Sequence, residues 1–257
     1  MNTTGSGSFE SSAVAVDARG GSVVVWANWA NHNEKDLDGV FGQRFDSAGA
    51  ALGTEIRVSA DAITAGPTVA MAPSGDFVVV WGSDGRVFGR RYDAAAAAVS
   101  GQFEVASDND VSERPAVAVD TAGGFIVVWE GADFIAPRQL GARGVFARRY
   151  DQAGNVLGSA IQVNDDPVAP YASPRVVADM HGDFLITWRQ LAPEGTGEDT
   201  VLEDIVFRRY DAAGMPLGTA VRVNPAGFAA VPDLAPALAA DRSGGFVIAW
   251  WGYFDNP

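Results

Sequence analysis

The chain has 257 residues, of which 47% are apolar and 19% are charged, so its composition predicts a folded globular protein and not a disordered one. It contains no cysteine, which excludes a disulfide framework and a thiolate metal site. The formal net charge of −14 argues against nucleic acid and anionic membranes as partners, and no apolar run approaches the ~20 residues of a membrane-spanning helix.

A short apolar tract that ends in tryptophan recurs along the chain. Its five copies are Ala13–Trp26, Thr68–Trp81, Ala116–Trp129, Arg175–Trp188 and Ala237–Trp250. A glycine stands six residues before each of these tryptophans, and an aspartate stands nine residues before four of them. Self-similarity at this spacing indicates a repeat architecture.

Each repeat has the pattern of four β-strands. A small apolar first strand is followed by a continuous apolar second strand, which is typical of a sheet covered on both faces. A more polar third strand and a short fourth strand follow, and no segment has the length and period of a helix. The third strands end in Arg44-Phe45-Asp46, Arg91-Tyr92-Asp93, Arg149-Tyr150-Asp151 and Arg209-Tyr210-Asp211.

Four-stranded units at this period predict an all-β fold, a β-propeller of four-stranded antiparallel blades; a β-sandwich is the alternative. We expect one propeller domain with four complete blades plus half of a fifth. Its predicted parts are an N-terminal tail or closing strand at 1–12, blades at 13–60, 66–107, 114–164 and 173–224, and a half blade at 234–257. We therefore expect another chain or a missing segment to complete the propeller.

The pattern Asp-x-x-Gly-Gly-Phe-x-Val-x-Trp, seen in full at Asp120–Trp129, resembles propeller repeats of large secreted or cell-surface proteins of bacteria. Such proteins are often calcium-binding or adhesin-like. The resemblance implies an extracellular or cell-surface location and a binding role in adhesion. The Asp and Gly positions are more weakly similar to the Asp-box hairpins of sialidases, which are structural turns.

The antiparallel strand order separates two kinds of connection. The turns between strands one and two, and between strands three and four, leave one face, and their repeated Asp and Gly residues are expected to be structural. The loops between strands two and three and between blades leave the opposite face and vary in length. These variable loops and their flanks carry 18 of the 32 acidic residues, and we expect the functional surface there.

Aromatic residues in the variable loops are the candidate binding residues, because rings beside carboxylates suit sugars and protein surfaces. They are Trp29, Phe134, Tyr171 and Phe228. The predicted function is a non-enzymatic binding or scaffolding module for a glycan or protein ligand. The alternative is a five-bladed glycosidase or sialidase-like enzyme with acidic residues near the axis, although the sequence singles out no catalytic pair.

No cofactor is required by these patterns, and calcium is the one candidate ion. Clusters of loop acids are weak candidates for it, because hard cations need several converging oxygens. They are Asp36, Asp38, Asp108, Asp110, Asp165 and Asp166. His32 and His181 fall on opposite faces, which argues against a shared metal. The arginines of the third strands are expected to pair across strands within a blade.

Overall fold

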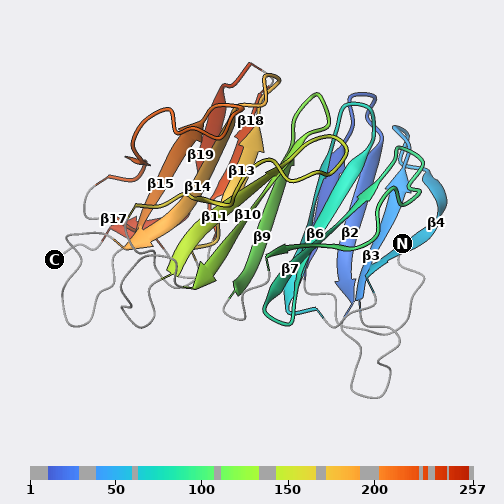
Figure 1. Ribbon diagram of the computed structural model, residues 1–257, viewed down its shortest axis with the longest axis horizontal. Coiled ribbons are helices and arrows are strands. Elements are labelled where there is room, and N and C mark those ends of the chain that lie inside the picture. The colour runs from blue at the N-terminus through green and yellow to red at the C-terminus, as the bar shows by residue number, and fades with distance from the viewer. Residues whose placement is uncertain are drawn as a thin grey trace. The chain divides into compact units, whose positions relative to one another are not determined.

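The computed structural model in Figure 1 describes the residues 11–28, 39–59, 63–106, 111–132, 143–165, 172–191, 203–225, 228–230, 235–241 and 243–254. These residues form strands and turns and no helix, so none of them belongs to a helix long enough to cross a membrane. The chain divides into two compact units, Met1–Val119 and Asp120–Pro257, which are described one at a time.

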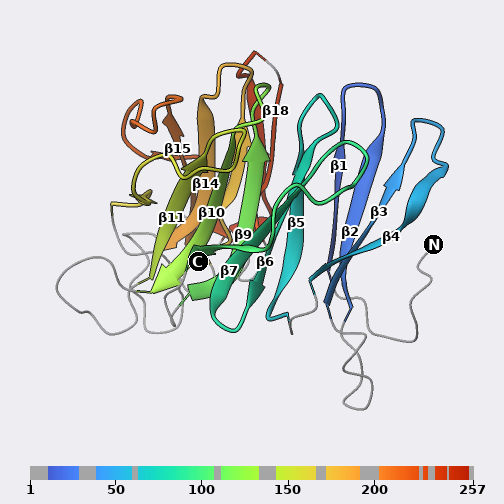
Figure 2. The same cartoon turned by 45° about the vertical axis from the view of Figure 1, so that its right-hand side comes forward.

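The first unit contains two four-stranded antiparallel sheets, each with its strands in chain order (Figure 2). The first sheet consists of β1 (Ser12–Val16), β2 (Ser22–Asn28), β3 (Gly39–Phe45) and β4 (Ala51–Ser59). The second consists of β5 (Ala65–Met71), β6 (Phe77–Ser83), β7 (Arg86–Tyr92) and β8 (Phe103–Ala106). The unit ends with β9 (Val111–Val119), the first strand of a third sheet of order β9-β10-β11-β12.

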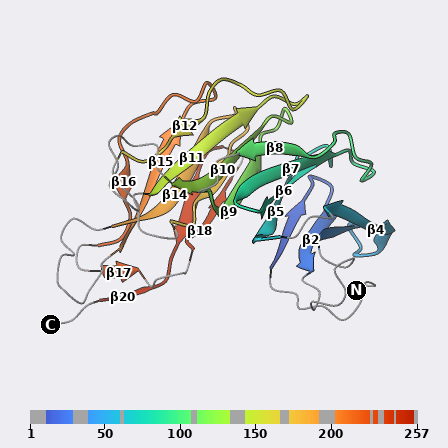
Figure 3. The same cartoon turned by 60° about the horizontal axis from the view of Figure 1, so that its bottom comes forward.

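The second unit continues the same pattern and then departs from it (Figure 3). It contains β10 (Phe125–Ala132), β11 (Arg143–Tyr150) and β12 (Ile161–Gln162), followed by the sheet β13 (Arg175–Ala178), β14 (Phe184–Leu191), β15 (Glu203–Tyr210) and β16 (Val221–Arg222). Two pairs of strands follow, β18 (Ala237–Ala240) with β19 (Phe246–Ala249), and β17 (Phe228–Ala230) with β20 (Gly252–Phe254).

The first strand of each sheet is the place where neighbouring sheets approach each other. In the first unit β5 contacts both β1 and β9, and in the second unit β13 contacts β18. A Cβ atom added to Gly66 in β5 would collide with the side chain of Ser11, so this position favours glycine. The small residues of the first strands therefore follow from close packing between sheets.

The second strands form the core. Every residue of β6 is buried, as the continuous apolar pattern predicts for a strand covered on both faces. At one end of the sheets a second-strand Phe stacks on a third-strand Tyr, with centroid distances of 4.8 Å for Phe77–Tyr92 and 4.9 Å for Phe184–Tyr210. These stacks fix the register of strands two and three through side-chain packing.

The last part of the chain differs from the expected start of a third strand at residue 252. The strand β20 does not pair with β19; its residues Gly252–Phe254 pair with β17 instead. Phe228, expected in a loop between blades, is the first residue of β17 and lies opposite Phe254. A short strand pair is thus present where the sequence pattern contained only a variable loop and a chain end.

Candidate functional site

The recurring turns of the repeat are held by the aspartate side chains. Asp17 Oδ1 accepts hydrogen bonds from the backbone N–H of Arg19 at 2.8 Å and of Gly21 at 2.9 Å. The same two-bond pattern recurs at Asp46, Asp93, Asp120, Asp179, Asp211 and Asp241. These contacts agree with the structural role predicted for the repeated aspartates.

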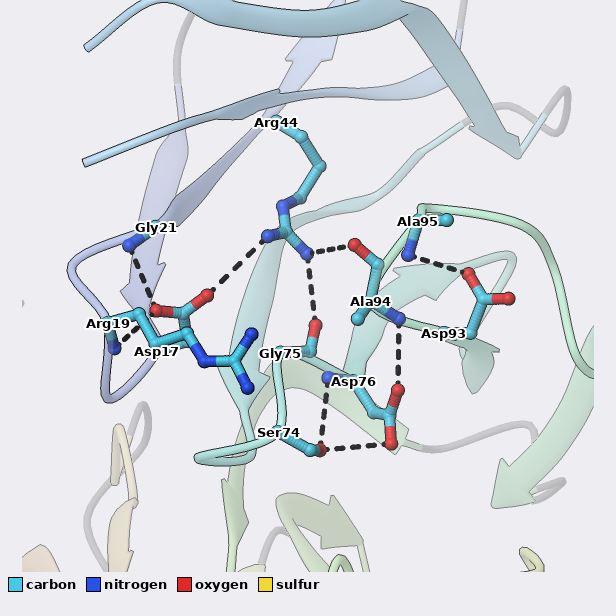
Figure 4. A network of polar contacts seen from close by, with 10 residues as sticks. All are labelled: Asp17, Arg19, Gly21, Arg44, Ser74, Gly75, Asp76, Asp93, Ala94 and Ala95. Atoms are coloured by element: carbon cyan, nitrogen blue, oxygen red, sulfur yellow. Dashed lines mark hydrogen bonds and ion pairs between the residues drawn. The ribbon is translucent and has the colours of Figure 1, made fainter. Parts of the chain in front are cut away.

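The arginine directly before the tract aromatic connects one sheet to the next at Arg44 and Arg149. In the first unit Arg44 Nη2 lies 3.6 Å from Asp17 Oδ2 of its own sheet, while its Nη1 donates to the carbonyls of Gly75 at 3.0 Å and Ala94 at 2.8 Å in the following sheet (Figure 4). Its guanidinium also lies 6.0 Å from the centroid of the Phe77 ring. In the second unit Arg149 donates in the same way to the carbonyls of Ala212 and Ala213.

In two repeats the arginine that immediately precedes the tract points back to the preceding sheet. Arg90 Nη1 donates to the carbonyl of Val58 at 3.1 Å, and Arg208 Nη1 donates to the carbonyl of Val163 at 3.2 Å. The long side chains reach backbone carbonyls of the neighbouring sheet, and these bonds join sheet to sheet.

The arginines of the tracts were expected to pair across strands within a blade. Arg44 does pair within its own sheet, with Asp17, but Arg44 and Arg149 also donate to the following sheet, which was not expected.

Tyr210 provides a test of this packing between sheets. Burial raises the pKa of Tyr210 to about 12, although Arg208 acts in the opposite direction, and its hydroxyl donates to the carbonyl of Val163. An unfolded tyrosine ionises near pH ~10. The raised pKa of Tyr210 therefore contributes to the free energy of unfolding an amount that is fully present below pH ~10 and is lost as the pH rises through 12. The expected loss is about 2–3 kcal/mol. Urea unfolding at pH 8 to 12 should show the loss, and Tyr210→Phe should show a smaller one, because burial also raises the pKa of Tyr92 and Tyr150. An identical pH dependence in the variant would contradict the assignment.

Buried ionisable side chains lie at the opposite ends of β10, β14 and β15 in the second unit, where strands two and three meet their variable loops. We call Glu130, Arg189, Glu203 and Asp204 the buried acid cluster, after this shared strand end; Arg189 and Glu203 are the two of them that form an ion pair. Arg189 Nη1 lies 2.9 Å from Glu203 Oε2, with the Arg189 side chain fully buried. Glu130 is also fully buried, and Asp204 is 3% exposed. Burial of charged groups is costly, which makes such a cluster a candidate functional site.

Polar neighbours hold the carboxylate of Asp204 in place. Its Oδ1 accepts from Asn224 Nδ2 at 3.0 Å and lies 3.1 Å from Arg222 Nε. Asn224 in turn accepts a hydrogen bond from the backbone N–H of Ile205 through its Oδ1. This arrangement fixes a carboxylate at the start of β15, directly after the variable loop.

The sequence analysis counted these acids among the acidic loop flanks but did not single them out. Glu130 and Arg189 directly follow Trp129 and Trp188, and the first two repeats have Ala27 and Gly82 at that position. Trp129 and Trp188 are buried, so a charged residue directly after either of them is itself expected near the core. That position was a signal by which the sequence could have indicated Glu130 and Arg189.

Most of the predicted site residues lie outside the described residues. These are Trp29, Phe134 and Tyr171 among the aromatics, and Asp36, Asp38, Asp108, Asp110 and Asp166 among the candidate calcium ligands. Asp165 is described, and its two carboxylate oxygens each accept a hydrogen bond from Arg208 Nη1 at 3.1 Å. In the part of the chain that is described, no three acidic or histidine side chains gather as metal ligands would.

The comparisons with known proteins rest on structure alone. No protein-family model matches the chain, and no curated protein matches it by sequence. Similar solved structures include an α-L-arabinanase of Penicillium chrysogenum complexed with arabinobiose (TM-score 0.59, 11% identity, covering 94% of this chain and 75% of that one). An α-L-arabinofuranosidase of Fusarium graminearum in complex with an iminosugar inhibitor has a TM-score of 0.61 at 10% identity, covering 94% of this chain and 74% of that one.

A third similar structure is hydrazine synthase of Kuenenia stuttgartiensis, with a TM-score of 0.57, 15% identity, and coverage of 92% of this chain and 60% of that one. The two glycosidases contradict the prediction of a non-enzymatic binding or scaffolding module, which is wrong, and they favour the glycosidase-like alternative. The all-β prediction of four-stranded antiparallel blades is confirmed, and at these identities the likeness shows the fold: the chain is a β-propeller of about five blades.

Proposed function

We propose that the chain is a glycoside hydrolase-like propeller whose reacting carboxyl groups come from the buried acid cluster. The observation that carries the proposal is the burial of Glu130, Glu203 and Asp204 at the loop end of strands two and three in the second unit. The first two repeats have no charged residue after the repeat tryptophan. The second unit thus bears the cost of burying acids at positions where the repeat does not need them.

Glycoside hydrolysis suits this set of residues. The reaction needs one carboxyl group that protonates the leaving oxygen and a second carboxylate that acts as a base or nucleophile. Glu130, Glu203 and Asp204 supply more than one carboxyl group, and Arg189 and Arg222 supply positive charge beside two of them. Rigid strands hold these side chains, while the variable loops that leave the same end would select the sugar.

The proposed substrates are glycans that contain arabinofuranose, the class suggested by the two glycosidases that share the fold. We also propose that the protein acts outside a bacterial cell. The absence of cysteine, the single lysine and the strong acidity support an extracellular setting.

Replacing the carboxyl groups one at a time tests the proposal. The full chain is incubated with 4-nitrophenyl glycosides, including the α-L-arabinofuranoside, and with arabino-oligosaccharides, and released 4-nitrophenol and reducing sugar are measured. We expect hydrolysis that Glu130→Gln, Glu203→Gln or Asp204→Asn lowers about 10²-fold or more.

The matched control is Glu104→Gln, which removes an acid that is 39% exposed and pairs with Arg86 in the first unit. It should leave the rate unchanged, and melting temperatures of all four variants separate loss of activity from loss of fold. The proposal is contradicted by a folded chain that hydrolyses no glycoside, or by full activity in all three cluster variants.

A further inference from the structure

The half blade formed by β18 and β19 exposes residues that the other sheets bury. Phe246 is 39% exposed, whereas Phe77, Phe125 and Phe184 at the same repeat position are at most 5% exposed. Val247 is 62% exposed, whereas Leu185 at the same position of β14 is 4% exposed. In the other four sheets the second strand has a third strand beside it, and among the described residues β19 pairs only with β18.

In three of the other repeats, a tyrosine of the third strand packs on the phenylalanine that is equivalent to Phe246. The equivalent phenylalanines stack on the tyrosine of their third strand, with centroids 4.8 Å apart for Phe77–Tyr92 and 4.5 Å apart for Phe125–Tyr150. Phe246 instead has a tilted contact with Phe207 of β15. One face of its ring is therefore matched to an incoming tyrosine.

In the first repeat, the aspartate of the first turn also pairs with an arginine of the third strand. Asp17 holds its turn through Oδ1 and receives the third-strand Arg44 near Oδ2. Asp241 holds the equivalent turn of the half blade through Oδ1, with Ser243 and Gly245 as donors. Its carboxylate is thus placed to attract the arginine that precedes the tyrosine in a third strand.

The third feature is an arginine of the neighbouring sheet. Arg44 is buried against the carbonyls of Gly75 and Ala94, the latter in the turn between strands three and four of the next sheet. The equivalent Arg209 is exposed, and within the described part of the chain its guanidinium makes no hydrogen bond or ion pair. It borders a shallow, solvent-open pocket lined also by Asp179, Asp183, Phe184, Gly244 and Phe246.

We propose that the β18–β19 half blade binds, by strand addition along β19, a polypeptide segment of the third-and-fourth-strand type that carries Arg-Tyr-Asp. Its tyrosine stacks on Phe246, its arginine approaches Asp241, and the carbonyls of its turn accept hydrogen bonds from Arg209. Main-chain hydrogen bonds to an open strand edge supply affinity, and these three side chains supply selection. The inference does not depend on the proposed hydrolase activity.

A peptide with the sequence of residues 143–164 is the probe, because it contains a complete third and fourth strand with Arg149 and Tyr150. Fluorescence anisotropy of the labelled peptide with the full chain should show saturable one-to-one binding. Hydrogen exchange should slow at residues 246–249 on binding. A peptide with Arg149→Ala and Tyr150→Ala should bind about five-fold more weakly or worse.

Variants of the full chain locate the binding site. Phe246→Ala should weaken peptide binding about five-fold or more, and Asp241→Asn, which keeps the side-chain oxygen that caps the turn, should weaken it less. Val14→Thr is the control, because Val14 is 63% exposed on β1 of the first unit and should have no effect on binding. The proposal is overturned by no peptide binding, by equal loss in the Val14 variant, or by self-association of the chain that protects residues 246–249 without peptide.

Discussion

Replacing Arg44 by alanine is expected to lower the free energy of unfolding by about 3–5 kcal/mol, because the change breaks a buried ion pair and leaves its partners unsatisfied. Arg44 is 6% exposed and contacts the carboxylate of Asp17 and the carbonyls of Gly75 and Ala94. The variant leaves an uncompensated carboxylate and two carbonyls in the space between two sheets. Urea unfolding followed by tryptophan fluorescence measures the difference.

Two further variants make this expectation specific. Arg19→Ala removes an exposed arginine from the same turn and should change the free energy of unfolding by less than about 0.5 kcal/mol. Arg44→Lys keeps the charge but not the planar fork of donors, so it should fall between the wild type and Arg44→Ala. If Arg44→Ala were no less stable than Arg19→Ala, the arginine would not be holding the two sheets together.

The second large effect is expected at Arg189. Replacing it by methionine removes the partner of Glu203 while keeping an apolar side chain in the core, and should cost about 3–5 kcal/mol. Both side chains of the pair are at most 7% exposed, so water cannot solvate the carboxylate that remains. Adding Glu203→Gln to the Arg189→Met variant should restore about 1–3 kcal/mol, because it removes the uncompensated charge.

The ion pair between Arg86 and Glu104 is the matched control for this cycle. Its side chains are 44% and 39% exposed, so Arg86→Met should cost at most about 1 kcal/mol. Chemical denaturation of the single and double variants gives the coupling energy in each case. If Arg189→Met and Arg86→Met lowered the free energy of unfolding by the same amount, the buried environment of the acid cluster would be contradicted.

Much of the fold could be predicted from the sequence because its signals are local. A turn such as that of Asp17 is closed by hydrogen bonds to residues two and four positions away, so the Asp and Gly spacing alone identifies it. The second strands are apolar at every position, which identifies a doubly covered strand without knowledge of its neighbours. Five copies of the same pattern then led to the propeller.

The candidate site could be predicted only in part. The sequence placed Glu130, Glu203 and Asp204 near variable loops, where many other acids also lie. What distinguishes these three is burial, and burial depends on which strands and side chains surround a residue after folding. Phe228 shows the same limit, because its partner Phe254 belongs to a segment with no repeat pattern.

The sequence by itself determined the strands, the turns and the register of the repeat, since each of these follows from residues close together in the chain. The tertiary structure alone decided the partners of the arginines. Arg44 bonds to carbonyls 31 and 50 residues away, and Arg208 to one 45 residues away. A backbone carbonyl has no sequence signature, so such a partner is defined only once folding has brought the strands together.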